Sequence, residues 1–215
     1  MPHESPSQCQ DWLELGFEIL GRHGEKALTI DTLCQRMGRT KGAFYHHFKG
    51  RRAFIQALMD HWEHRYTAGV IEAMAPHGDP RRRLLELSAL TTEAVDLRLE
   101  RAIRVWADRE PSVRATLERV DGQREGYLFA QFEALTGSAR RARLAARCHM
   151  AIFVGTQMLY QDLTREALRE VNALAETLGM DFGSGQTEPE VSPIDTHSPA
   201  SDDEETIDGL ADGLA

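Results

Sequence analysis

The side chains with the clearest chemical potential lie between Arg22 and Arg52. This stretch holds eight Lys and Arg residues against two acidic ones, a formal charge of +6, although the whole chain carries -9. Ten acidic residues and no Lys or Arg fall between residues 181 and 215, which leaves the first 180 residues close to neutral. A local basic surface attracts phosphate groups whatever the total charge is. The acidic total therefore does not exclude a nucleic-acid partner.

The same stretch has the pattern of two short helices joined by a tight turn. After the capping residue Thr29, apolar side chains recur at i, i+3, i+4 and i+7, namely Ile30, Leu33, Cys34 and Met37. Gly38 is predicted to end this helix, and Thr40 to cap a second one. Phe44 and Phe48 form an i, i+4 pair that faces the core. The pattern predicts a helix-turn-helix.

The second of these helices keeps short, polar or basic side chains on its free face. They are Thr40, Lys41, Ala43, Tyr45 and His46. A recognition helix needs such side chains to reach base edges and phosphates, and Gly42 allows close approach. Lys49, Arg51 and Arg52 fall at the start of the next helix, where free N–H groups also favour a phosphate.

Residues 29–54, and most specifically the run Lys41–Phe48, resemble the N-terminal DNA-binding domain of the TetR/AcrR family of bacterial transcriptional regulators. The similarity extends over roughly residues 8–58. It implies an all-α homodimer of about nine helices with a C-terminal domain for ligand binding and dimerisation. It also implies binding to double-stranded DNA, usually with repression that a small molecule relieves.

The resemblance assigns DNA contacts to particular residues. It implies phosphate contacts by Tyr45 and His47 and major-groove positions for Thr40, Lys41, Gly42 and His46. Arg51 stands where the family usually has Lys, which keeps the charge but changes the donor geometry. Arg39 and Met37 depart from the family's usual small residues. Arg39 either contacts a phosphate or lays its aliphatic chain along the protein surface with the guanidinium in water. The predicted DNA-binding set is Thr29, Arg39, Thr40, Lys41, Gly42, Ala43, Tyr45, His46, His47, Lys49 and Arg51.

An ordinary helical hairpin with solvated basic residues is the alternative explanation of this pattern. The glycine turn, the aromatic pair and the basic cluster together favour DNA binding over it. No metal site and no cofactor are expected. The adjacent His46 and His47 cannot face one point, and His61 and His64 lack a third ligand of suitable spacing.

The remaining sequence is helical in its periodicity, so the predicted fold class is all-α. Helices are expected at about 80–97, 99–109, 111–136, 138–162 and 165–178. We assign residues 1–52 to a three-helix DNA-binding domain and residues 53–180 to a helical ligand-binding and dimerisation domain. Residues 181–215, rich in acids, Pro and Gly, are expected to form a disordered tail.

An aromatic set in the second domain is the candidate for a small-molecule pocket. Its members are Trp62, Tyr66, Trp106, Phe129, Phe132, His149, Met150 and Phe153. Small-molecule sites are built from apolar walls with a few orienting polar groups. The alternative is that helical spacing places most of these residues in the core.

Two apolar stripes predict a dimer interface. The first stripe recurs every four residues and consists of Ala151, Gly155 and Leu159, where the small central residue allows a second helix to approach closely. The second stripe consists of Leu168, Val171, Leu174 and Leu178. The alternative is that both stripes pack within one chain. A monomer would then leave part of this surface as an exposed apolar patch.

Several function classes are disfavoured. The sequence lacks a nucleophile–base pair, a paired-carboxylate site and a glycine-rich phosphate loop, so no enzyme is predicted. A regulator without an effector and, less favoured, a helical carrier or enzyme remain as alternatives. Cys9, Cys34 and Cys148 have no metal-ligand spacing, and no leader or long apolar run is present, so a cytoplasmic protein with reduced thiols is expected.

Overall fold

The computed structural model describes residues 6–74, 78–160 and 162–184, and these ranges contain helices and no strand. The predicted all-α class is confirmed. The helices are α1 Pro6–His23, α2 Ile30–Met37, α3 Lys41–His47, α4 Arg51–Glu63, α5 Gly69–Met74, α6 Pro80–Ala94, α7 Leu97–Ala107, α8 Pro111–Thr136, α9 Ala139–Leu159 and α10 Arg165–Ser184. Because a π-helical turn, His64–Ala68, joins α4 to α5, these two form one rod, and the described chain has nine separate helices.

Short-range capping sets the helix ends at the N-terminal part of the chain. The hydroxyl of Thr29 accepts a hydrogen bond from the Thr32 N–H at 3.1 Å, and that of Thr40 accepts one from the Ala43 N–H at 3.3 Å. Gly38 ends α2 with φ of 63°, a left-handed conformation that glycine adopts without strain. The capping roles predicted for Thr29, Gly38 and Thr40 are thus confirmed, which fixes both ends of the turn.

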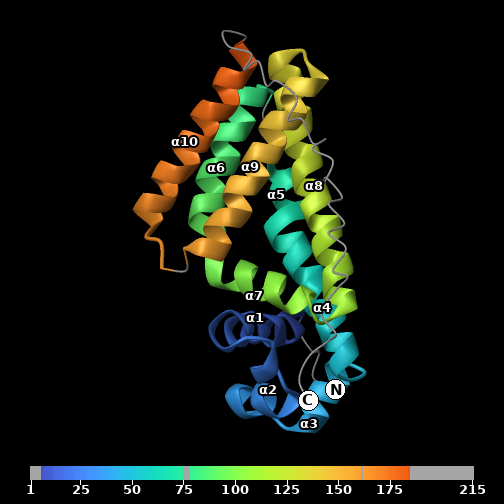
Figure 1. The fold of residues 1–215 in the computed structure, drawn as a ribbon. Helices are drawn as coiled ribbons and strands as arrows, with labels where there is room; N and C mark the ends of the chain where they lie inside the picture. The colour runs from blue at the N-terminus through green and yellow to red at the C-terminus, as the bar shows by residue number, and fades with distance from the viewer. Residues whose placement is uncertain (1–5, 75–77, 161, 185–215) are drawn as a thin grey trace, which may run out of the picture.

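Figure 1 shows α1, α2 and α3 at one end of the molecule and the long helices α6, α8, α9 and α10 at the other. The α4–α5 rod runs from the first group into the second, and α7 lies across their junction. The larger hydrophobic core joins α1–α4 to α7 and the first part of α8, from Trp12 to Val120. A smaller core, centred on Leu84, Leu128 and Phe132, joins α6, α8 and α9.

Some helix boundaries differ from those predicted. The break after α6 comes at Val95 because Asp96 caps α7, accepting hydrogen bonds from the N–H groups of Arg98 and Leu99. Helix α9 ends at Leu159, three residues early, and α10 continues to Ser184, past the predicted stop at Gly179. A single glycine costs a helix only about 1 kcal/mol, so Gly179 does not suffice to end it. Most of the predicted disordered tail, residues 185–215, lies outside the described residues.

The π turn between α4 and α5 depends on Gly69. A Cβ atom at this position would lie 2.8 Å from the carbonyl oxygen of His64, which no real Cβ tolerates. We expect Gly69→Ala to lower the free energy of unfolding by about 1–3 kcal/mol because the backbone must shift. The measurement is chemical denaturation.

Gly126→Ala is the matched control for this substitution. Gly126 lies in α8, and a Cβ there would meet nothing within 4 Å. Alanine should therefore raise the free energy of unfolding by up to about 1 kcal/mol through its helix propensity. Equal effects of the two substitutions would contradict a special role for Gly69.

Within the described residues, no helix is both long enough and apolar enough to cross a membrane.

Candidate DNA interface and ligand pocket

The orientation of α3 is set by an aromatic cluster beneath it. Phe44 is fully buried. The centre of its ring lies 5.6 Å from the ring centres of Trp12 and Phe54 and 5.2 Å from that of Phe48. These contacts hold one face of α3 against α1 and α4. The opposite face of α3 is consequently turned away from the protein.

The predicted DNA-binding residues share this outward face and the turns that flank it. Most are exposed, namely Thr29, Arg39, Thr40, Lys41, Gly42, Tyr45, His46, Lys49 and Arg51. Ala43 and His47 are half-buried, and Ala43 packs against the larger core. The structure therefore brings the set together at one end of the molecule (Figure 1).

Four cations on this end have no ion pair among the described residues. They are Arg39, Lys49, Arg51 and Arg52. Lys41 is different, because its ammonium lies 2.6 Å from the carboxylate of Asp31 in α2, and this hydrogen bond is the first cause of a raised pKa for Lys41. Both side chains are well exposed, so a competing anion can exchange with this pair at small cost.

The first turn of α4 offers backbone donors beside these cations. Gly50 precedes the helix with φ of 123° and supplies no side-chain cap. Within the described residues, no side chain caps the N–H groups at the start of α4, next to Lys49 and Arg51. Open N–H groups and the positive end of a helix dipole together favour a phosphate.

A buried ionic cluster ties α4 to α7 and α8. Glu100 is 1% exposed, accepts a hydrogen bond from the Trp62 indole N–H at 2.8 Å, and forms two hydrogen bonds with Arg124, at 2.9 and 3.1 Å. Arg124 also donates to the Thr67 hydroxyl in the π turn at 2.9 Å. Its guanidinium lies 5.2 Å from the ring centres of Trp62 and Phe153. The cluster therefore connects the lower end of the molecule to α9.

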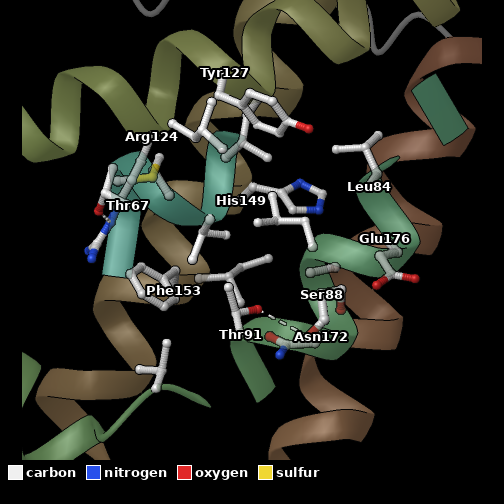
Figure 2. Close-up of a pocket in the computed structure, with 18 of the residues that line it drawn as sticks. Thr67, Leu84, Ser88, Thr91, Arg124, Tyr127, His149, Phe153, Asn172 and Glu176 are labelled. Atoms are coloured by element: carbon white, nitrogen blue, oxygen red, sulfur yellow. Dashed lines mark hydrogen bonds between the residues drawn. The ribbon is translucent and has the colours of Figure 1, made fainter. Parts of the chain in front are cut away.

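Arg124 also belongs to the wall of an apolar cavity of about 110 Å³ in the upper part of the molecule (Figure 2). The π turn, α5, α6, α8, α9 and α10 all contribute to the wall. Its polar members include Thr67, Ser88, Thr91, Arg124, Tyr127, His149, Asn172 and Glu176. Burial lowers the pKa of His149, whose Nδ1 lies 3.3 Å from the Ala145 carbonyl oxygen, so the ring is neutral at pH 7.

Half of the residues predicted for this pocket line it. Tyr66, His149, Met150 and Phe153 do so. The other four are not in the wall. Trp62 and Trp106 belong to the larger core, Phe132 belongs to the smaller core, and Phe129 packs against the smaller core. These four residues are therefore packed in or against the cores, as the alternative interpretation of their helical spacing predicted.

Arg124 and Tyr127 were missed by sequence reasoning. Polar residues on a long helix are usually solvent-facing, and α8 has no clear apolar stripe that would mark its inner face. A detectable signal was the i, i+4 pair of Arg124 and Leu128, which puts the cation on the same face as a core residue.

The predicted dimer surface is largely open in the single chain. Leu159 is 72% and Leu174 61% exposed, Ala151 is exposed, and Gly155 and Val171 are half-buried. Leu168 differs from this stripe, because it is buried within the protomer. The side chain of Leu178 lies outside the described residues.

Both the N-terminal segment and the overall fold resemble those of known proteins. Residues 13–58 match the family model described as bacterial regulatory proteins, tetR family. No curated protein matches the sequence. Among solved structures, a TetR transcriptional regulator from Legionella pneumophila is similar with a TM-score of 0.68 at 11% identity, over 83% of this chain and 99% of that one.

Two further solved structures have the same fold. A transcriptional regulator from Rhodococcus sp. Rha1 gives a TM-score of 0.62 at 18% identity, over 80% of this chain and 96% of its own. A protein from Saccharomonospora viridis, assigned as a transcriptional regulator and solved with choline, gives 0.65 at 12% identity, over 80% and 97% of the two chains. The resemblance found in the sequence is confirmed: the chain carries the N-terminal domain and the all-helical fold of a TetR-family transcriptional regulator.

Proposed function

We propose that this protein is a cytoplasmic, homodimeric repressor that binds a palindromic operator through two helix-turn-helix units and is released by a small molecule. The observation that carries the DNA-binding part is the group of four cations beside α3 that form no ion pair within the described part of the chain, together with the start of α4, which has no side-chain cap there. Two such groups, one per protomer, fit two half-sites on one face of a duplex. No catalytic step is part of the proposal.

The residues proposed to contact DNA fall into two roles. Lys41, Gly42 and His46 face bases in the major groove, whereas Tyr45, His47, Lys49 and Arg51 hold phosphates. We propose that Asp31 releases Lys41 when a phosphate or base edge takes its place. The functional boundaries proposed are residues 1–52 for DNA binding and residues 53–180 for ligand binding and dimerisation.

Dimerisation through α9 and α10 is supported by their exposed apolar side chains. Ala151, Gly155, Val171 and Leu174 are proposed interface residues together with Leu159, and Leu178 remains a candidate. Leu168 is better explained as part of the protomer's own packing. Large exposed apolar side chains on neighbouring helices mark an interaction surface.

The proposed release mechanism uses the α4–α5 rod. Its π turn and α5 supply Tyr66, Thr67, Val70 and Ile71 to the cavity wall, while its other end begins at the DNA-proximal Arg51. A ligand that displaces these wall residues would move the rod and change the separation of the two recognition helices. A ligand that binds tightly and leaves operator affinity unchanged would contradict this mechanism.

Substitution of phosphate-binding residues tests the DNA-binding part. Lys49→Ala or Arg51→Ala should weaken binding to all duplex sequences alike and reduce the slope of log K against log salt by about one unit. Lys41→Ala should instead reduce the preference for the operator over random duplexes. Binding is measured by fluorescence anisotropy over a range of salt concentrations.

Arg81→Ala is the control for charge alone. Arg81 is exposed near the start of α6, at the far end of the molecule from α3 (Figure 1). This variant loses the same charge and should retain the parent salt slope. Identical salt slopes for the parent, Lys49→Ala, Arg51→Ala and Arg81→Ala would remove Lys49 and Arg51 from the proposed phosphate contacts.

A further inference from the structure

The cationic surface beside α3 holds positive charge that its own segment does not balance. It consists of four side chains that form no ion pair within the described part of the chain, namely Arg39, Lys49, Arg51 and Arg52. Between residues 26 and 52 the chain has seven Lys and Arg residues against a single acidic one, Asp31, which is paired with Lys41. The surface therefore attracts a polyanion, including one that belongs to the same chain.

A segment with the charge of a polyanion follows α10. Residues 185–215 hold nine acidic residues and no Lys or Arg, and six of the nine fall within residues 202–212, the acidic run. Four of these six are consecutive, from Asp202 to Glu205. An extended chain advances about 3.3 Å per residue, so these four carry one negative charge per 3.3 Å. One strand of duplex DNA carries one charge per roughly 3.4 Å, which is nearly the same linear density.

The acidic run lies far enough along the chain to reach the cationic surface. Figure 1 shows α8 and α10 ending at the end of the molecule opposite to α3. The α4–α5 rod and α8 are about 36 and 39 Å long. Because α4 and α8 pack side by side, the distance from α3 to the end of α10 is shorter than the combined length of about 75 Å. Residues 205–212 can extend about 70–100 Å from Ser184, which spans this distance.

From these observations we propose that the acidic run docks on the cationic surface when no DNA is bound and competes with DNA for it. The proposal rests on the proposed function in taking this surface as the DNA interface, and it adds a regulation of that interface. Exposed ion pairs are individually weak, so the run covers the surface for only part of the time. Duplex DNA has about twice the charge density of the run, counting both strands, and displaces it.

The competition has a definite dependence on salt. The apparent affinity for DNA falls in proportion to the fraction of molecules in which the surface is covered. Salt weakens the docking of the run as well as the binding of DNA, so the covered fraction is largest at low salt. Removal of the acidic charges should therefore tighten DNA binding at low salt and make affinity fall more steeply as salt rises.

Docking is tested first without DNA, by carbodiimide cross-linking of the full chain at low salt and mass spectrometry of its peptides. This reagent joins a carboxylate to an amine that it contacts, and the chain has three lysines, Lys26, Lys41 and Lys49. We expect links between the acidic run and Lys49, and an excess of duplex should abolish them. Lys26 is the internal control. It is exposed, but its neighbour Glu25 pairs with Arg109 after α7, so it lies toward α7 rather than beside α3.

Two variants that lose the same charges test the competition. The far variant loses one Asp and two Glu charges within the acidic run, by Asp202→Asn, Glu204→Gln and Glu205→Gln. The near variant loses one Asp and two Glu charges closer to α10, by Glu188→Gln, Glu190→Gln and Asp195→Asn. Residue 195 extends at most about 40 Å from Ser184, which is only the length of α8. Because α3 lies beyond the start of α8 (Figure 1), the near charges do not reach the cationic surface.

Binding of a labelled duplex of random sequence, about 30 base pairs long, is measured by fluorescence anisotropy. Since the competition is electrostatic, it does not require the operator sequence. At about 50 mM salt the far variant should bind about threefold more tightly than the parent, and the near variant should differ less than about 1.5-fold. At about 300 mM salt all three proteins should bind alike.

Four results would overturn the proposal. They are the lack of a link between the acidic run and Lys49, links to Lys26 as frequent as those to Lys49, equal gains in the near and far variants, and a far variant that binds as the parent does. Tighter binding by the far variant without the Lys49 link would show simple repulsion between the run and DNA. Failure of the proposed function is distinct, because a parent that forms the Lys49 link but binds no duplex at any salt would keep the docking and contradict DNA binding.

Discussion

Replacement of Glu100 by Ala is expected to lower the free energy of unfolding by about 3–5 kcal/mol, which is the usual cost of removing one partner of a buried ion pair. Glu100 is 1% exposed and is the shared acceptor for Trp62 and Arg124. Its loss leaves the Arg124 guanidinium buried without a counter-charge and the Trp62 indole N–H without an acceptor. Equilibrium denaturation in urea, followed by tryptophan fluorescence, measures the change.

An exposed ion pair in the same half of the molecule provides the matched control. Glu125 pairs with Arg147 at 3.3 Å, and the two side chains are 42% and 64% exposed. Glu125→Ala should cost less than about 1 kcal/mol, because water already screens this pair. If Glu100→Ala is no more destabilising than Glu125→Ala, the buried cluster does not hold α4, α7 and α8 together.

Monomers should result from the double substitution Leu159→Asp and Leu174→Asp, with operator affinity lowered by about a hundredfold or more. Among the side chains of α9 and α10 that the structure describes, these are the two most exposed large apolar ones. Two carboxylates per protomer would be buried without partners in the proposed interface. In a dimer, binding of one unit to its half-site holds the second unit at a high effective concentration near the other half-site. A monomer would lose this gain in affinity. Sedimentation velocity reports the association state, and anisotropy reports the affinity.

The control is Leu85→Asp, an apolar side chain on α6 that is 44% exposed. It adds an exposed carboxylate on a helix outside the proposed interface, so both association and operator affinity should match the parent. A doubly substituted protein that stays dimeric would show that the interface lies elsewhere. A monomer that keeps full operator affinity would contradict the need for two linked units.

Features encoded within a few residues were predictable from the sequence. Thr29 and Thr40 cap their helices because the hydroxyl reaches an N–H group three residues ahead, and Gly38 ends α2 because it adopts a positive φ. These local rules located the helix-turn-helix and its outward-facing residues. They also explain why the resemblance to the TetR family is strongest over this segment.

Features that depend on distant parts of the chain were not predictable. Trp62 was expected in the pocket, but Glu100, 38 residues later, accepts its indole N–H and holds it in the core. The pairing of Lys41 with Asp31 across the turn and the burial of the Tyr127 hydroxyl likewise depend on packing. The π turn escaped detection because the apolar spacing of Phe54, Leu58, Trp62 and Tyr66 continues through it.

The continuous core from Trp12 to Val120 has a consequence for protein engineering. Chimaeric regulators are made by joining the DNA-reading part of one protein to the sensing part of another. A junction at residue 52 would separate Phe44 and Phe48 from their packing partner Phe54, and α1 from α7. A DNA-binding segment that is moved to another regulator must therefore include α7 and the first part of α8. Otherwise, its side chains must form an equivalent core with the helices of the recipient protein.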